Sequence, residues 1–192
     1  FVVSSIMLVL SPLVLIPVGI AIKMSSPGPL FFKQRRTGLR GKAFTCYKFR
    51  TMRVNSQSDT VQATKDDPRK TKVGDFLRKT SIDELPQFFN ILKGDMSVVG
   101  PRPERPEIAD EYTKEVPEFA YRLQVKAGLT GYAQVFGKYN TTSYDKLKLD
   151  MVYVENCSIL LDIKLILLTL KVIFIKESTE GLEEGQTTAM KK

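Results

Sequence analysis

The distribution of apolar residues separates a membrane-like start from a mixed middle and a second apolar stretch near the end. Residues 1–22 are almost wholly apolar and carry no charge, and about 20 such residues suffice for a helix to cross a bilayer. Ser11 and Pro12 lie at the midpoint, where proline removes a backbone hydrogen bond, so we expect the helix to bend sharply or break there. Two topologies stay open: a kinked span, which hydropathy favours, or a segment that enters one leaflet and returns.

The middle of the chain alternates short strand-like and helical segments, which predicts a small α+β domain that is mainly helical with a short β segment. Residues 43–52, AFTCYKFRTM, have the alternation of a strand in which Lys48 and Arg50 share one face. Apolar spacing over residues 73–97 predicts a short helix, a break and a second helix. The apolar segment from Ile159 carries three charged residues, which favours an amphipathic helix lying in the membrane interface over a spanning helix.

The most informative stretch is residues 80–103, TSIDELPQFFNILKGDMSVVGPRP, which contains a carboxylate pair and an apolar helical run. Ser81 and Glu84 have the spacing of a capping box, in which the Ser side chain accepts from the Glu84 N–H. This places Asp83 in the first helical turn, where the helix dipole favours the ionised carboxylate. An ionised, positioned Asp can act as a base, a metal ligand or a covalent nucleophile. The simpler alternative is that both acids only cap a helix.

The same stretch ends in the turn Pro101-Arg102-Pro103. The prolines restrict the backbone on both sides of Arg102, which suits a guanidinium held ready for a phosphate or a carboxylate. Residues 122–140 contain three glycines but lack the spacing of a P-loop or of a Rossmann turn. The sequence therefore supports neither of these nucleotide-binding folds.

Composition and charge narrow the chemistry further. The chain of 192 residues fits one domain with an appended membrane element, and its net charge of +8 indicates anionic partners: nucleic acid, anionic lipid or phosphate-bearing substrates. It has no His, which excludes His-based acid–base catalysis, His-containing triads and His-ligated zinc. Cys46 and Cys157 form no CxxC pair, so we expect a reduced, cytosol-facing domain without a catalytic thiol. Residues 33–53 carry eight basic residues and no acidic one, as is typical of the cytoplasmic flank of a membrane segment.

These motifs, in this order, resemble the monotopic phosphoglycosyl transferases, the bacterial sugar transferase family. The likeness covers about residues 4–176, and its motifs are a Pro-broken apolar hairpin, YKFRTM, KTSIDELPQFFNILKGDMSVVGPRP, KAGLTGYAQVFGK and KLKLDMVYVENCS. The resemblance implies an enzyme that transfers a sugar-1-phosphate from a UDP-sugar to polyprenyl (undecaprenyl) phosphate and releases UMP. It further implies a covalent aspartyl phospho-sugar intermediate, Mg²⁺ as cofactor, and a role in the first membrane step of exopolysaccharide, capsule or glycoconjugate synthesis.

The resemblance also assigns roles to individual residues. It implies that Asp83 attacks the β-phosphorus of the nucleotide sugar and that Glu84 helps to bind Mg²⁺. Lys48 and Arg78 would stabilise the phosphate charge. Lys138 follows Gly137 where the family usually has Arg, which keeps the charge but loses bidentate geometry. The full set is catalytic Asp83, Glu84, Lys48 and Arg78, substrate-binding Arg102, Pro101, Pro103, Arg50, Gln134 and Lys138, and metal-binding Glu84, Asp83 and Asp150.

The resemblance favours the re-entrant topology over the span. Residues 1–32 would form a re-entrant membrane helix-break-helix with its break at Ser11 and Pro12, and residues 33–176 a catalytic domain that includes the C-terminal interfacial helix. Residues 177–192 would be a disordered tail. The enzyme would lie on the cytoplasmic face of the bacterial inner membrane, in contact with membrane lipids, and a homodimer is one alternative for its assembly. Because the chain starts at Phe and its ERPE and STEG segments look like those of larger members, we expect it to be the catalytic portion of a longer protein.

Two non-enzymatic interpretations compete with the transferase. The chain could be a basic membrane-surface module in which the two acids only cap a helix. It could also bind nucleic acid, but only its charge suggests this, and no recognisable nucleic-acid-binding motif is present. The sequence does not indicate which sugar is carried or which polymer is started.

Overall fold

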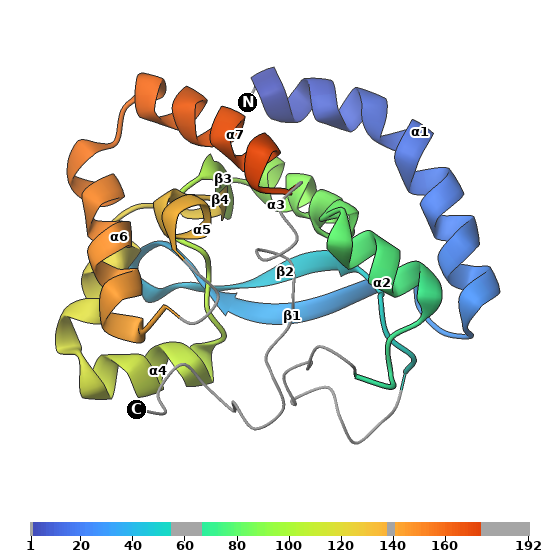
Figure 1. Cartoon of the computed structure of the whole chain (residues 1–192), viewed down its shortest axis with the longest axis horizontal. Helices are drawn as coiled ribbons and strands as arrows, with labels where there is room; N and C mark the ends of the chain where they lie inside the picture. The colour runs from blue at the N-terminus through green and yellow to red at the C-terminus, as the bar shows by residue number, and fades with distance from the viewer. Residues whose placement is uncertain (1, 55–66, 138–140, 174–192) are drawn as a thin grey trace.

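The structure is a computed structural model that describes residues 2–54, 67–137 and 141–173, with side chains described from residue 12 to residue 172 of these ranges. It combines helices with two short sheets, which confirms the predicted mixed, mainly helical α+β fold (Figure 1). The strands are β1 (Phe31–Thr37), β2 (Ala43–Phe49), β3 (Met96–Val99) and β4 (Ala127–Thr130). The α-helices are α1 (Val2–Ser25), α2 (Lys72–Lys79), α3 (Phe88–Lys93), α4 (Pro106–Glu115), α5 (Tyr132–Phe136), α6 (Ser143–Asn156) and α7 (Ile159–Ile173). The 3₁₀ helices are η1 (Leu39–Gly41), η2 (Ile82–Gln87) and η3 (Pro117–Gln124).

The first sheet is the antiparallel hairpin of β1 and β2, which lies at the centre of the domain (Figure 1). Its register pairs Phe32 with Lys48 and Gln34 with Cys46. Directly paired residues point to the same face, and alternate residues along one strand do so too. Lys48 therefore shares its face with Gln34 and also with Arg36, two positions further along β1.

The second sheet pairs β3 and β4 in parallel and leads directly into the Pro-Arg-Pro turn. Three glycines let the two backbones approach closely at its end. A Cβ at Gly128 would lie 2.1 Å from the Gly100 nitrogen, and one at Gly131 would lie 2.2 Å from the Gly100 oxygen. Only glycine fits such contacts, so this packing sets where the chain enters the turn.

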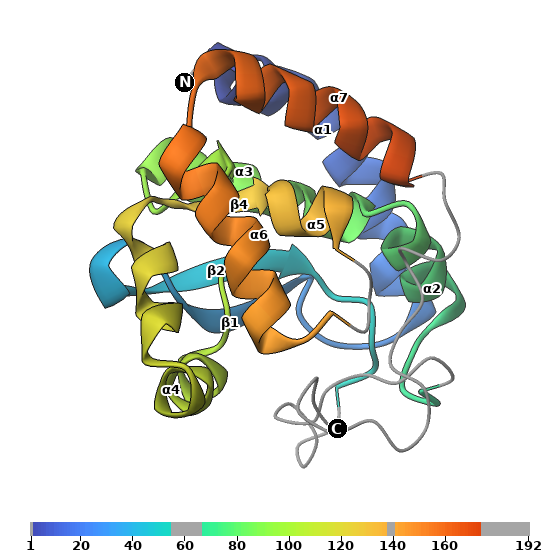
Figure 2. The ribbon, with the colours of Figure 1, turned by 60° about the vertical axis from the view of Figure 1, so that its left-hand side comes forward.

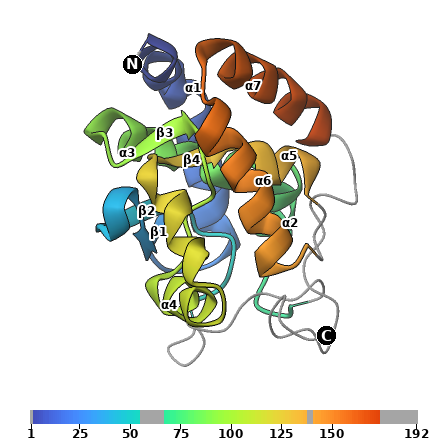
Figure 3. The same cartoon turned by 90° about the vertical axis from the view of Figure 1, so that its left-hand side faces the viewer.

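Helices α1 and α7 lie on one side of the domain and α4 lies on the opposite side in all three ribbon views (Figures 1, 2 and 3). The buried Ile22 of α1 packs with Phe49 and Leu77, and the buried Leu165 of α7 packs with Val99 and Tyr153. Both helices also expose large apolar side chains, namely Leu13, Ile16, Ile20 and Met24 of α1 and Ile159, Leu160, Leu167 and Leu170 of α7. Contact of these faces with membrane lipid stays a prediction.

Helix α1 passes through Ser11 and Pro12 as one helix, with a second proline at Pro17. Within Val2–Ser25 the structure thus shows no break at the predicted position, and α1 instead curves along its length (Figure 1), which is one way in which a helix accommodates the lost hydrogen bond and the steric clash of proline. Within the part of the chain that the structure describes, no helix is both long and apolar enough to span a membrane. The re-entrant topology and the division at residues 32 and 176 stay predictions, and residues 177–192 lie outside the described residues.

Arg50 joins the end of α1 to the hairpin. Its guanidinium donates to the carbonyl oxygens of Ser26 (Nη2, 2.7 Å) and Pro27, and the residue is only 6% exposed. This corrects the expected place of Arg50 on the face of Lys48. Strand β2 ends at Phe49, so Arg50 does not follow the alternation of the strand, and its buried guanidinium is satisfied by these two carbonyls after α1.

We expect Gly28→Ala to destabilise the fold more than Gly41→Ala. Both glycines have positive φ, so alanine brings backbone strain of about 1–2 kcal/mol at either site. A Cβ at Gly41 meets no atom within 4 Å, whereas one at Gly28 would lie 2.0 Å from Nη1 of Arg50 and would displace its hydrogen bonds. Urea unfolding in detergent should show a further loss of roughly 1–3 kcal/mol for Gly28→Ala. Equal losses for the two variants would contradict this role of Arg50.

Candidate active site

The acidic pair Asp83 and Glu84 lies in the first turn of η2, as the sequence predicts, but the predicted capping box is wrong. Ser81 has left-handed backbone angles (φ 55°, ψ 13°), and its side chain makes no capping hydrogen bond. The Glu84 N–H donates instead to the Ser81 backbone carbonyl at 3.2 Å. The Glu84 carboxylate turns towards two cations, because charge-assisted hydrogen bonds are stronger than a bond to a neutral N–H.

Glu84 is held by Lys48 and Arg102. Its Oε1 accepts from Lys48 Nζ and from Arg102 Nη2, both at 2.6 Å, and its Oε2 lies 3.3 Å from Arg102 Nη1. Burial by itself would raise the pKa of Glu84, but the charges of Arg102 and Lys48 outweigh burial and hold this pKa well below its usual range. Glu84 therefore stays ionised at any pH near neutrality.

Asp83 has a different electrostatic setting, although it is the next residue. It is 9% exposed, and this burial raises the pKa of Asp83 to about 6. The charge of Lys48 opposes the increase, whereas the negative charge of Glu84 adds to it. The predicted effect of the helix dipole, a preference for the ionised form, is outweighed by this desolvation. At pH 7 Asp83 is mostly ionised and poorly solvated, which is the state of a reactive carboxylate.

Arg78 completes the positive surroundings of the pair. Its Nε donates to Thr51 Oγ1 at 2.9 Å and its Nη2 lies 3.3 Å from Met52 Sδ, so the loop after β2 holds the side chain in place. The charge of Arg78 lowers the pKa of Asp83, as does that of Arg102. The structure thus brings together all four catalytic candidates of the sequence (Asp83, Glu84, Lys48 and Arg78) with Arg102.

The structure places Asp150 elsewhere. Asp150 is fully buried on α6 and pairs with Arg122, with 2.6 Å between Oδ2 and Nη2. Burial raises the pKa of Asp150 and outweighs the charges of Arg122 and Lys146, which lower this pKa. Among the described residues, Asp150 forms no metal-binding group with Asp83 and Glu84, so the structure does not place it as a third metal ligand beside them.

The remaining substrate-binding candidates have separate positions. Pro101 and Pro103 are buried on either side of Arg102. Gln134 lies on α5, where both polar atoms of its amide are buried and have no hydrogen-bond partner among the residues that the structure describes. Lys138 lies outside the described residues. A substrate contact by any of these residues stays a prediction.

The two adjacent carboxylates of Asp83 and Glu84 are a suitable partial ligand set for Mg²⁺. Mg²⁺ is commonly held by one or two carboxylates together with substrate phosphates and water. In the part of the chain that the structure describes, Oε2 of Glu84 accepts only the longer hydrogen bond from Arg102, so this oxygen can accept a further partner. Among the described residues, no group of three or more Asp, Glu, His or Cys side chains is placed to hold a metal ion. The donor set therefore fits an ion shared with a phosphate-bearing ligand.

Sequence reasoning missed Arg36, which lies on the same face of the hairpin as Lys48. Its Nη1 donates to the Pro103 carbonyl at 2.8 Å. Burial and the neighbouring charge of Arg102 lower the pKa of Arg36. Cys46 shares this face, and burial raises the pKa of its thiol, which keeps it protonated. The alternation in FFKQRRT opposite AFTCYKF could have predicted the position of Arg36, had the two segments been paired as a hairpin.

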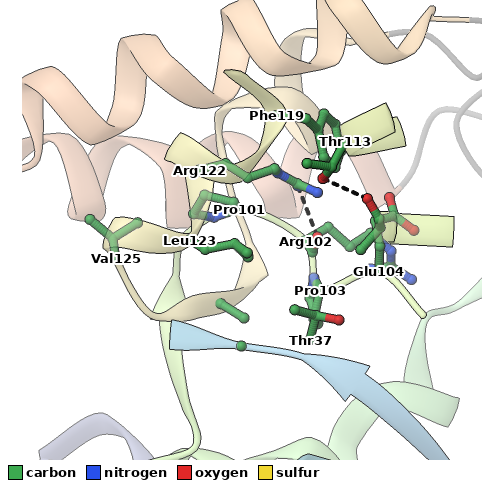
Figure 4. A pocket seen from close by; sticks show the side chains of 13 residues that line it. Thr37, Pro101, Arg102, Pro103, Glu104, Thr113, Phe119, Arg122, Leu123 and Val125 are labelled. Atoms are coloured by element: carbon green, nitrogen blue, oxygen red, sulfur yellow. Dashed lines mark hydrogen bonds between the residues drawn. The ribbon is translucent and has the colours of Figure 1, made fainter. Parts of the chain in front are cut away.

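A small cavity lies behind the Pro-Arg-Pro turn, lined by residues that include Arg102, Glu104 and Arg122 (Figure 4). Its volume of about 20 Å³ holds about one water molecule, so a nucleotide cannot enter it. The cavity is therefore too small to serve by itself as the substrate site.

A family model described as bacterial sugar transferase matches residues 1–176 of the chain. The chain is 43% identical over 179 residues to the UDP-glucose:undecaprenyl-phosphate glucose-1-phosphate transferase of Escherichia coli K12, which covers 90% of this chain and 38% of that protein. It is 44% identical over 167 residues (85% and 39%) to the UDP-N-acetylgalactosamine-undecaprenyl-phosphate N-acetylgalactosaminephosphotransferase of Aeromonas hydrophila. It is 42% identical over 167 residues (78% and 34%) to the undecaprenyl-phosphate galactose phosphotransferase of Salmonella typhimurium. The chain spans between 34% and 39% of the length of these relatives.

We expect Asp83→Asn to stabilise the protein at pH 7. The pKa of Asp83 is about 6 in the fold and near 3.8 in the unfolded chain, so between these values the native state binds more protons and stability falls as pH rises. The neutral amide removes this cost, with an expected gain of roughly 1–3 kcal/mol at pH 7 that disappears below about pH 4. Thermal unfolding at both pH values measures the difference.

The control for this experiment is Asp75→Asn on α2, since Asp75 is a more exposed carboxylate paired with Lys79. Its substitution should change stability only slightly at either pH. A loss of stability in Asp83→Asn at pH 7 would show that the Asp83 carboxylate is not a desolvated group.

Proposed function

The chain belongs to the bacterial sugar transferase family, and on that premise we propose that it transfers a sugar-1-phosphate from a UDP-sugar to undecaprenyl phosphate and releases UMP. The observation that carries the proposal is the juxtaposition of Asp83 and Glu84 with Lys48, Arg78 and Arg102. A diphosphate substrate needs charge compensation, and these three cations supply it beside a desolvated carboxylate.

The proposed reaction has two displacements at the same phosphorus. The ionised Asp83 carboxylate attacks the β-phosphorus, and the bond from this phosphorus to the oxygen that bridges to the α-phosphorus breaks. UMP leaves with that oxygen and its electron pair. A phosphate oxygen of undecaprenyl phosphate then attacks the phosphorus, and the bond to Asp83 breaks, which restores the carboxylate and yields undecaprenyl diphosphate sugar.

This route needs no general base, which agrees with a chain that has no His. A carboxylate with a pKa of about 6 is already ionised at neutral pH, and burial leaves it weakly solvated and therefore nucleophilic. Lys48, Arg78 and Arg102 would stabilise the charge on the phosphoryl oxygens and on the leaving phosphate. Glu84 keeps Lys48 and Arg102 in place through their shared hydrogen bonds.

Mg²⁺ is the cofactor that this proposal includes. Glu84 and Asp83 would hold it, and when bound it would neutralise phosphate charge beyond what the three cations supply. Arg102 would contact the nucleotide part of the substrate, and Gln134 and Lys138 would contribute further substrate contacts.

The proposed location is the cytoplasmic face of the bacterial inner membrane, at the first membrane step of exopolysaccharide, capsule or glycoconjugate synthesis. The exposed apolar side chains of α1 and α7 suit contact with a lipid leaflet, where the polyprenyl acceptor resides. The relatives are named for glucose, N-acetylgalactosamine and galactose at 42% to 44% identity, so similarity does not select the sugar.

A non-catalytic basic membrane module is less well supported. In that alternative the two acids would only cap a helix. The Ser81 side chain makes no capping bond, however, and the Glu84 carboxylate is used by Lys48 and Arg102.

We expect a panel of UDP-sugars with undecaprenyl phosphate and Mg²⁺ to identify a donor from which UMP is released. Asp83→Asn should reduce turnover by at least about 1000-fold, because an amide cannot serve as the nucleophile. Without acceptor, the wild type should retain a protein-bound phospho-sugar that Asp83→Asn lacks. The matched control is Asp75→Asn on α2, which should keep wild-type turnover. Wild-type turnover in Asp83→Asn would sink the assignment of Asp83.

We also expect the rate of adduct formation without acceptor to depend on the ionisation of Asp83. The reactive form of Asp83 is the ionised one, so the rate should fall about tenfold per pH unit below the pKa of this carboxyl, which is about 6 in the metal-free protein and lower where Mg²⁺ is bound to it. Omission of the acceptor removes the titration of its own phosphate, which occurs near pH 6. Lys48→Met should move the midpoint to higher pH, because the charge of Lys48 lowers the pKa of Asp83. A rate that is constant between about pH 5 and 8 would argue against Asp83 as the titrating group.

A further inference from the structure

The backbone of residues 101–104, the Pro-Arg-Pro turn with the following Glu, is held at every carbonyl. Each of its four consecutive carbonyl oxygens accepts a hydrogen bond from another segment. The donors are the Gly128 N–H to Pro101 (3.0 Å), Arg122 Nη2 to Arg102 (2.9 Å), Arg36 Nη1 to Pro103 (2.8 Å) and the Thr37 N–H to Glu104 (2.9 Å). The turn is thus fixed by β4, by η3 and by β1, which are far apart in the sequence.

The donor to the Arg102 carbonyl is itself rigidly held. Arg122 is 2% exposed, and the same Nη2 lies 2.6 Å from Oδ2 of the fully buried Asp150. Its guanidinium carbon also lies 4.7 Å from the centre of the Phe119 ring. Figure 4 shows Arg122 reaching from η3 to the Arg102 carbonyl beside Phe119. An ion pair and a ring contact therefore determine where Arg122 can place its donor.

A buried ion pair of this kind is a poor source of stability. Desolvation of two charges consumes most of their attraction, and a well-packed apolar pair of similar volume is often equally stable or more so. An apolar pair, however, has no donor and cannot form a directed hydrogen bond to a carbonyl oxygen. The planar guanidinium can serve a carboxylate and a carbonyl together.

We propose that Arg122, oriented by Asp150, is a positioning residue for Arg102. By holding the Arg102 carbonyl, it fixes the backbone from which the guanidinium of Arg102 reaches Oε1 of Glu84 at 2.6 Å. A shift of about 1 Å at a catalytic group can reduce the rate about 100-fold, so a remote donor can matter as much as a nearer one. This inference rests on the proposed function, in which Arg102 contacts the nucleotide part of the substrate.

The test replaces the ion pair by an apolar pair, Arg122→Met/Asp150→Leu, which leaves no charge buried without its partner. The melting temperature should stay close to that of the wild type. Single-turnover formation of the phospho-sugar adduct should nevertheless fall by about 10- to 100-fold. The control is Tyr153→Phe, which removes the buried hydroxyl that donates to Asp162 and Val99 at the junction of α6 and α7. Tyr153→Phe should keep the wild-type rate.

A double-mutant cycle separates positioning from general structural support. If Arg122 acts through Arg102, the paired substitution should have no further effect on the rate in an Arg102→Ala background. A loss of equal size in both backgrounds would overturn the proposal, and so would a wild-type rate in the folded pair variant. If the pair variant does not fold, the same cycle is run with Arg122→Lys. This variant should lose part of the adduct-formation rate, and the loss should likewise be absent in the Arg102→Ala background.

The failure of this inference differs from the failure of the proposed function. A wild-type protein that forms no adduct with any UDP-sugar would remove the proposed function. An active wild type with an unaffected pair variant would remove only the role of Arg122.

Discussion

The fold converges on one carboxylate, that of Glu84, which binds Lys48 and Arg102 through the same oxygen atom. Lys48 comes from β2, Glu84 from η2, and Arg102 from the turn after β3, so this group of hydrogen bonds joins three segments that are far apart in the sequence. Buried charge is tolerated only where it is paired, and Glu84 meets this condition with two cations. Asp83 occupies the same buried place without equal compensation, which is why its pKa rises while that of Glu84 falls.

Neither sheet can hold this arrangement alone, because a two-stranded sheet is marginally stable by itself in water. The hairpin of β1 and β2 packs on α1 through the buried Phe49, and Arg50 ties the strand end to the turn after α1. The parallel pair of β3 and β4 is shorter, and it depends on the close approach of Gly128 to Gly100. The side chains of the candidate active site are thus carried by short elements that are supported by the surrounding helices.

The charged residues around the site form two sets with different tasks. Lys48, Arg78 and Arg102 surround the acidic pair and can meet a phosphate-bearing ligand. Behind the turn, Arg36 and Arg122 donate to backbone carbonyls, and Glu104 pairs with Lys146 at 2.6 Å. These contacts restrain the backbone of the turn, which is a structural reason for the burial of these charged groups.

The sequence by itself determined the family, the mixed helical fold and the adjacency of Asp83 and Glu84, because these features lie in local motifs. The grouping of this pair with Lys48 and Arg78 was implied by the resemblance to the family, since these residues come from distant segments. The tertiary structure alone decided that Ser81 makes no side-chain cap, that Arg50 binds the turn after α1, and that Asp150 pairs with Arg122. Each of these outcomes depends on a partner from a distant segment. A buried charge takes the strongest partner that folding brings to it, and the order of residues does not show which partner that will be.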